Sequence, residues 1–188
     1  MKQAKTLNER ELKTVLAICA TRRYAERDRV IVLMSFYAGL RAKEIAALTI
    51  GNVIGDDGCV RSECVLAAQQ TKGRSARRIF FNSKLQRELG TYIKTLDHPD
   101  PAMPLFLTQK RTGFTANSMC HLFIDIYKNA GIDGASSHSG RRSLLTALAS
   151  KGVSVRVLQE VAGHSSIAVT QRYIDVNDHQ MRAAIEMV

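Results

Sequence analysis

Two short stretches in the second half of the chain decide the fold. They are His138-Ser139-Gly140-Arg141-Arg142 and Ala162-Gly163-His164-Ser165-Ser166, and Tyr173 follows nine residues after His164. A guanidinium can hold two oxygens of one phosphate, an imidazole can move protons, and a phenol hydroxyl can attack phosphorus. These residue types therefore indicate chemistry on a phosphodiester.

Matching residue types occur upstream of these stretches. Arg41 precedes Glu44 by about one helical turn, and Lys72 lies in the turn Thr71-Lys72-Gly73-Arg74-Ser75. A second guanidinium would complete a phosphate clamp, and a lysine could supply a proton. The candidate catalytic set is Arg41, Lys72, His138, Arg141, His164 and Tyr173, with Glu44 in a supporting role.

The first half of the chain predicts helices followed by a hairpin. Thr6 and Glu9 have the spacing of a capping box, so we expect a first helix after Thr6, and apolar-rich helical stretches follow at 25–37 and 42–48. Short β-branched and aromatic runs on either side of the glycine-containing turn predict a β-hairpin over about 59–81. A helix is expected over about 83–96.

The second half predicts helix almost throughout. Capping and stop residues delimit helical runs over 115–130, up to Lys151, over 154–163 and from Ser165 towards Tyr173. A last amphipathic helix is expected over about 177–188. The predicted fold class is α+β and mainly helical, with a small β-sheet or hairpin between N-terminal helices and a C-terminal helical half, in a single domain over 1–188.

The charge balance favours a polyanionic partner. The 188 residues carry 27 Lys and Arg against 17 Asp and Glu, a formal charge of +10 with a pI near 9.8. The alternative at this level is a basic surface without such a partner. If the partner is DNA, the residues expected to contact its phosphates are Lys43, Arg74, Arg77, Arg78 and Arg142.

The cysteines and the apolar stretches bear on cofactors, cellular location and membrane insertion. The four cysteines are scattered without zinc-ligand spacing, so free thiols and a reducing cytosol are expected. The sequence has no Gly-x-x-x-x-Gly-Lys-[Ser/Thr] loop and no clustered carboxylates for magnesium, so no metal or cofactor is expected. The longest apolar stretch, around residues 30–40, is too short to span a bilayer.

Four boxes in order resemble the catalytic domain of the tyrosine recombinases, or phage integrase family, from about residue 6 to 174. Gly39-Leu40-Arg41-Ala42-Lys43-Glu44-Ile45 resembles the first-arginine box, and Thr71-Lys72-Gly73 resembles the hairpin-lysine box. The two stretches quoted first resemble the His-x-x-Arg box and the final box with its tyrosine. Gly140 and Arg142 depart from the Leu and His that many relatives carry there.

The resemblance implies a site-specific DNA recombinase that works without metal or ATP. Tyr173 would attack phosphorus to form a 3′-phosphotyrosine, while Lys72 protonates the departing 5′-oxygen. Arg41, Arg141 and His164 would stabilise the transition-state charge. His138 would give acid/base support, and Glu44 would orient Arg41.

The resemblance also implies partners. These are double-stranded DNA and a homo-tetramer on paired sites, with a monomer as the alternative in isolation. The helix at 177–188 would dock on a neighbouring protomer or pack on its own domain. Because the predicted helices begin near Thr6, we expect the chain to lack the N-terminal DNA-clamping domain that relatives often carry, as either a fragment or a chain similar to short members such as the fimbrial invertases. A cytoplasmic, DNA-associated protein is expected.

Two other functions remain open at this level. A type IB topoisomerase-like enzyme would share the cleavage chemistry and differ in the strand that it religates. A non-catalytic DNA-binding regulator would keep the fold, and degenerate chemistry would be its signature. A serine hydrolase is excluded because residues 163–166 do not form a Gly-x-Ser-x-Gly elbow.

Overall fold

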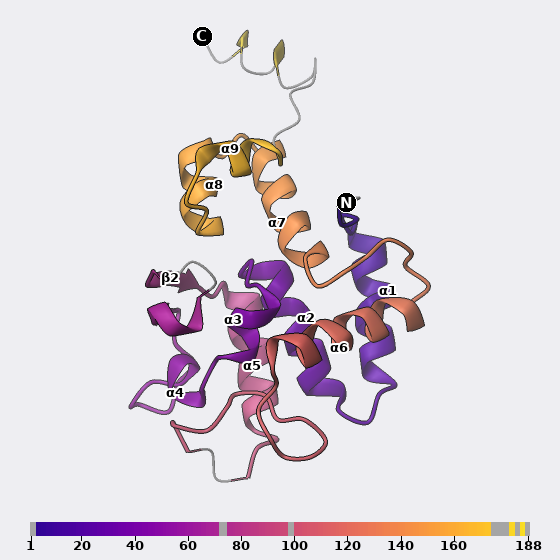
Figure 1. Ribbon diagram of the computed structural model, residues 1–188, viewed down its shortest axis with the longest axis vertical. Helices are drawn as coiled ribbons and strands as arrows, with labels where there is room; N and C mark the ends of the chain where they lie inside the picture. Colours follow the sequence, from indigo (N-terminus) through magenta and orange to yellow (C-terminus); the bar gives the residue numbers. More distant parts are fainter. Residues whose placement is uncertain (1–2, 72–74, 98–99, 174–180, 183–184, 187–188) are drawn as a thin grey trace.

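Helices dominate the computed structural model, which describes residues 3–71, 75–97, 100–173, 181–182 and 185–186 (Figure 1). One antiparallel sheet of two strands is the only sheet among these residues. The helices are α1 (Glu9–Ala20), α2 (Ala25–Tyr37), α3 (Ala42–Ala46), α4 (Ile50–Val53), α5 (Ser83–Ile93), α6 (Ala116–Asn129), α7 (Ser139–Ser150), α8 (Val155–Ala162) and α9 (Ile167–Gln171). The predicted fold class, mainly helical with a small sheet, is confirmed.

The first helix begins later than the sequence predicted. Asn8, not Thr6, is the N-cap: its side chain accepts from the backbone N–H of Glu11, whose carboxylate accepts from the N–H of Asn8. Leu7 is buried, and its N–H donates to Ser143 Oγ at 2.6 Å. This tertiary contact keeps the residues before Asn8 out of the helix, so the predicted Thr6–Glu9 capping box is wrong.

The predicted hairpin is confirmed as two short strands. β1 (Glu63–Leu66) pairs antiparallel with β2 (Arg77–Phe80), so that Leu66 lies opposite Arg77 and Glu63 opposite Phe80. A 3-10 turn, η1 (Ala68–Gln70), follows β1. Burial alternates along both strands, as expected for a sheet with one face on the core. Arg77 therefore points inward and not to solvent.

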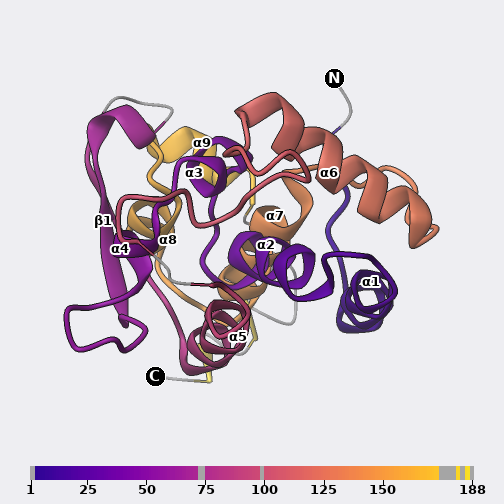
Figure 2. The same ribbon diagram turned by 90° about the horizontal axis from the view of Figure 1, so that it is seen from below.

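α2 forms the centre of the core. Residues 30–34 are all buried, and α1, α5 and α7 pack around this helix (Figure 2). At Gly140 of α7 an added Cβ would lie 2.8 Å from Ser35 Oγ and 3.0 Å from the backbone N of Phe36. The glycine therefore lets α7 approach α2 closely, which sets the position of Arg141 beside it.

The second half follows its predicted caps. Thr115 caps α6 and Ser154 caps α8, each accepting a backbone N–H with its side chain. α7, α8 and α9 form one end of the molecule, with α8 above β2 and α3 (Figure 1). Most of the predicted helix at 177–188 lies outside the described residues. Of this segment, Met181 and Ile185 are described, and both are exposed. Within the described part of the chain, no helix has the length and apolarity needed to cross a bilayer.

Candidate active site

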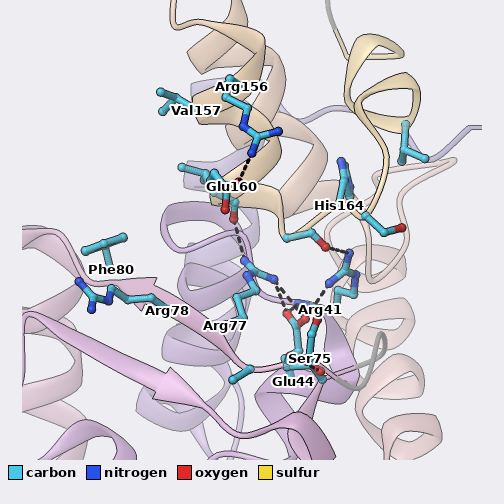
Figure 3. A pocket seen from close by; sticks show the side chains of 16 residues that line it. Arg41, Glu44, Ser75, Arg77, Arg78, Phe80, Arg156, Val157, Glu160 and His164 are labelled. Atoms are coloured by element: carbon cyan, nitrogen blue, oxygen red, sulfur yellow. Dashed lines mark hydrogen bonds and ion pairs between the residues drawn. The ribbon is translucent and has the colours of Figure 1, made fainter.

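Residues of α3, β2, α8 and α9 line one cavity of about 820 Å³. Arg41 is the N-cap of α3, Arg77 lies on β2, and His164 follows the C-terminus of α8; all three line the cavity (Figure 3). Arg141, in the first turn of α7, lies directly behind His164. Tyr173 follows α9, and its ring stacks on His164 with centroids 5.7 Å apart. The fold thus gathers residues that are far apart in sequence.

Glu44 is the anion that organises two of these arginines. Its fully buried carboxylate accepts from Arg41 Nη1 at 2.7 Å, from the Arg41 backbone N–H at 2.8 Å, and from Arg77 Nη1 at 3.0 Å. Burial alone would raise the pKa of Glu44, but the two guanidiniums and the backbone N–H outweigh it and lower that pKa. Glu44 is therefore ionised and fixes both arginines.

The C-terminus of α8 is the second organiser. Its carbonyls at 161, 162 and 163 receive one guanidinium each: Arg77 Nη2 donates to Val161 O at 2.8 Å, Arg141 Nη2 to Ala162 O, and Arg41 Nη2 to Gly163 O at 3.3 Å. The last carbonyls of a helix have no partners within it and carry the negative end of its dipole. The helix end thus holds three cations together.

Gly163 makes this arrangement possible. Its φ of +57° lies in the left-handed region, which ends α8, and an added Cβ would stand 2.6 Å from Arg77 Cδ. Both the backbone conformation and the space therefore require glycine. The glycine at position 163 of the motif therefore has two structural reasons: it ends α8 in a left-handed conformation, and it leaves room for the Arg77 side chain.

Arg141 is the most buried member of the cluster. Only 4% of it is exposed, and its Nη1 donates to Gly39 O at 2.6 Å. Burial, followed by the charges of Arg41 and Arg77, lowers the pKa of Arg141 to about 9. It therefore remains charged at pH 7, and the surrounding carbonyls fix its direction.

His164 is held between a cation and a hydroxyl. Its Nε2 lies 3.1 Å from Arg141 Nη2, and its Nδ1 lies 2.9 Å from Thr170 Oγ1. Burial and then the charges of Arg141, Arg41 and Arg77 lower the pKa of His164 to about 4. In the free protein at neutral pH this imidazole is therefore neutral and adds no positive charge.

The other candidate residues lie around this centre. His138, the N-cap of α7, lines an adjoining cavity of about 290 Å³ together with Arg142 and Tyr173. The Nε of Arg142 is buried and has no hydrogen-bond partner among the residues that the structure describes. Val169 lines both cavities, whereas Tyr173 lines the smaller one and reaches the larger one through its stacking on His164. Lys72 and Arg74 lie outside the described residues.

Of the basic residues predicted to contact DNA, Lys43 and Arg78 are exposed and Arg77 is buried. Arg78 is exposed on β2, and exposed Lys43 donates from Nζ to Thr71 O at 3.1 Å. Arg77 corrects the prediction, because it is 9% exposed and its guanidinium is engaged by Glu44 and Val161 O. It belongs to the interior of the site rather than to a solvated basic run.

Sequence reasoning missed two participants. The inward position of Arg77 could have been found from strand alternation, since Arg77, Ile79 and Phe81 share one face. Thr170 offers no comparable signal, because a threonine in a short helix is ordinary. Among the described residues, no group of three or more His, Cys, Asp or Glu side chains could hold a metal ion.

Comparison with known proteins assigns a class to this fold and site. Residues 5–180 match the model of the phage integrase family, so the chain belongs to that family. Among its relatives is tyrosine recombinase XerA of Pyrococcus horikoshii, 28% identical over 183 residues, which cover 97% of this chain and 60% of the relative. The chain thus spans about 60% of the length of this curated relative.

Solved structures share the fold. The crystal structure of XerA recombinase has a TM-score of 0.77 at 24% identity, covering all of this chain and 66% of the other. The catalytic domain of bacteriophage HP1 integrase has a TM-score of 0.67 at 20% identity, covering 98% of this chain and 95% of the other. The Tn1549 transposon integrase in complex with circular intermediate DNA has a TM-score of 0.76 at 20% identity, covering 100% and 68%.

Proposed function

We propose that residues 1–188 form the catalytic domain of a site-specific DNA recombinase that cleaves and rejoins DNA through a 3′-phosphotyrosine at Tyr173. The observation that carries the proposal is the convergence of Arg41, Arg141 and His164 beside the Tyr173 ring. Membership of the phage integrase family supports the reaction class, and an integrase of this fold in complex with DNA supports DNA as the partner.

The chemistry follows from the side chains gathered around the cavity. Tyr173 passes its phenol proton to a general base, here assigned to His138, and its Oη attacks phosphorus. The electrons of the breaking P–O bond go to the 5′-oxygen, which takes a proton from a general acid, here assigned to Lys72. Arg41 and Arg141 donate N–H groups to the non-bridging oxygens and stabilise the pentacoordinate transition state. A 5′-hydroxyl of a second strand then attacks the phosphotyrosine, which reverses the first step.

Arg41 can reach the phosphate by exchanging partners. Three guanidiniums donate to carbonyls at the C-terminus of α8, and the bond from Arg41 Nη2 to Gly163 O is the longest of them, at 3.3 Å. The other nitrogen, Arg41 Nη1, donates to the Glu44 carboxylate at 2.7 Å. One edge of the guanidinium therefore remains fixed while the other turns to the phosphate. His138, which lines the smaller cavity together with Tyr173, supports proton transfer there, and exposed Arg78 adds a DNA phosphate contact.

The proposed assembly is a homo-tetramer on paired double-stranded sites in the cytoplasm. We expect the segment at 177–188 to dock on a neighbouring protomer, because Met181 and Ile185 are exposed where they are described. Packing on its own domain is the alternative. Sedimentation with and without a paired-site DNA distinguishes a DNA-dependent tetramer from a persistent monomer.

Covalent trapping tests the proposal. The protein is incubated with fragmented genomic DNA of the source organism, denatured with SDS, and the attached DNA is sequenced. We expect an adduct with the wild type and with Tyr37→Phe, a tyrosine outside the site, and none with Tyr173→Phe. Absence of the wild-type adduct despite salt-sensitive DNA binding would indicate a regulator instead.

A second assay separates recombination from relaxation. A plasmid with two copies of the trapped sequence is compared with a plasmid that has one. Strand exchange between the two copies supports a recombinase, because religation must use a second strand. Relaxation of both plasmids without exchange would assign a type IB topoisomerase-like activity.

A further inference from the structure

Hydrogen-bond accounting around His164 fixes where its proton lies. The Arg141 guanidinium has only N–H donors, so the His164 Nε2 that it contacts at 3.1 Å must accept. A neutral imidazole with an unprotonated Nε2 carries its proton on Nδ1. That proton points at Thr170 Oγ1, 2.9 Å away. The Thr170 hydroxyl is therefore the acceptor in this state.

Thr170 is well placed to hold the ring. It lies on α9, three residues before Tyr173, and is fully buried. The opposite side of the imidazole is fixed by Arg141 from α7, and its face stacks on the Tyr173 ring at an interplanar angle of 19°. A ring rotation that exchanged Nδ1 and Nε2 would break both hydrogen bonds at once. The site thus has one favoured orientation of His164.

We propose that Thr170 is a positioning residue that holds His164 in the Nδ1–H form with Nε2 directed at the phosphate site. The inference rests on the proposed function for its catalytic consequence, but the proton position belongs to the free protein. It adds a residue that the recombinase boxes of the sequence analysis did not contain.

This orientation of His164 allows its Nε2 to donate a hydrogen bond to a bound phosphate. When Arg141 turns its N–H groups to a phosphate oxygen, Nε2 loses its donor and can take up one proton from the solvent. The ring then carries N–H at both nitrogens, so that Nε2 donates to the phosphate while Nδ1 still donates to Thr170 Oγ1. The groups that face the ring during this step are Arg41, Arg77, Arg141 and Tyr173.

Two substitutions separate the hydroxyl from the packing. Thr170→Val keeps the shape of the buried side chain and removes the hydrogen-bond acceptor, whereas Thr170→Ser keeps the hydroxyl and removes the methyl group. If packing alone mattered, Thr170→Ser would be the more harmful change. If the hydroxyl holds His164, Thr170→Val is the harmful one and Thr170→Ser restores the wild-type behaviour.

The first measurement is the ¹⁵N NMR spectrum of the imidazoles in the free protein, with His164→Gln identifying the signal. We expect His164 protonated at Nδ1 in the wild type and in Thr170→Ser, and a mixture of tautomers in Thr170→Val. Protonation at Nε2 in the wild type would overturn the inference. This measurement needs no DNA, so its outcome is independent of whether the protein recombines DNA.

The second measurement is single-turnover cleavage of the trapped DNA sequence across pH. We expect Thr170→Val to reduce the cleavage rate by about 10–100-fold, the range found when the partner behind a functional histidine is removed in metal sites, with DNA affinity unchanged. Its pH profile should shift, while that of Thr170→Ser should not. Equal rates for the two variants would refute the positioning role, whereas no cleavage by the wild type would refute the proposed function.

Discussion

Glutamine in place of Glu44 tests whether one buried carboxylate holds the arginine cluster together. The change keeps the size of the side chain and removes the charge that pairs with Arg41 and Arg77. Removing one partner of a buried ion pair typically costs about 3–5 kcal/mol, because the other charge is left uncompensated. For a chain of this size each kcal/mol lowers Tm by about 2–4 °C, so we expect a decrease of roughly 6–20 °C.

The assay is urea unfolding followed by circular dichroism, supported by thermal unfolding. Glu88→Gln is the matched control, because Glu88 receives both Arg29 Nε and Nη2 at 2.6 Å but lies in a partly exposed pair. A pair of this kind contributes about 0–1 kcal/mol. Glu44→Gln with Arg77→Met should recover stability relative to Glu44→Gln alone. If Glu44→Gln costs no more than Glu88→Gln, the reasoning is refuted.

Three further outcomes follow from the geometry. Gly140→Ala should lower the free energy of unfolding by about 1–3 kcal/mol, because the added methyl group overpacks against α2. Gly90→Ala, whose Cβ would have only an ordinary contact at 3.9 Å, should raise it by about 0.5–1 kcal/mol. Equal urea midpoints for the two variants would contradict this. Gly163→Ala should lower both stability and adduct formation, because Arg77 must move; adduct formation equal to that of the wild type would contradict it. Stability should fall as pH decreases from about 6.5 to about 4, since the unfolded chain protonates His164 more readily than the folded chain; His164→Gln should flatten that slope, and an unchanged slope would argue against it.

Local signals predicted much of the helical framework. Thr115 and Ser154 cap their helices and Gly163 ends α8, because capping and a left-handed backbone depend on residues within one turn. The start of α1 was misplaced by two residues for the opposite reason. Asn8 and Thr6 both suit an N-cap, and the choice was made by Leu7, which is bound to α7 through Ser143.

The candidate catalytic residues were predicted from sequence alone, because their types and order resemble the boxes of one family. Neither pattern nor spacing placed Arg77 at Glu44 or Thr170 at His164. The first contact joins residues 33 positions apart, and Arg41 and Gly163 are 122 apart. Such distances are bridged only when helices pack around α2.

Sequence by itself therefore determined which chemistry-bearing side chains the protein has and on which elements they lie. Tertiary structure decided their charge and direction. Arg77 is an interior cation, Glu44 a buried anion and His164 a neutral ring only because packing removes water and brings guanidiniums, a carboxylate and the carbonyl end of α8 together. Desolvation and nearby charge shift protonation, and both depend on neighbours that are remote along the chain.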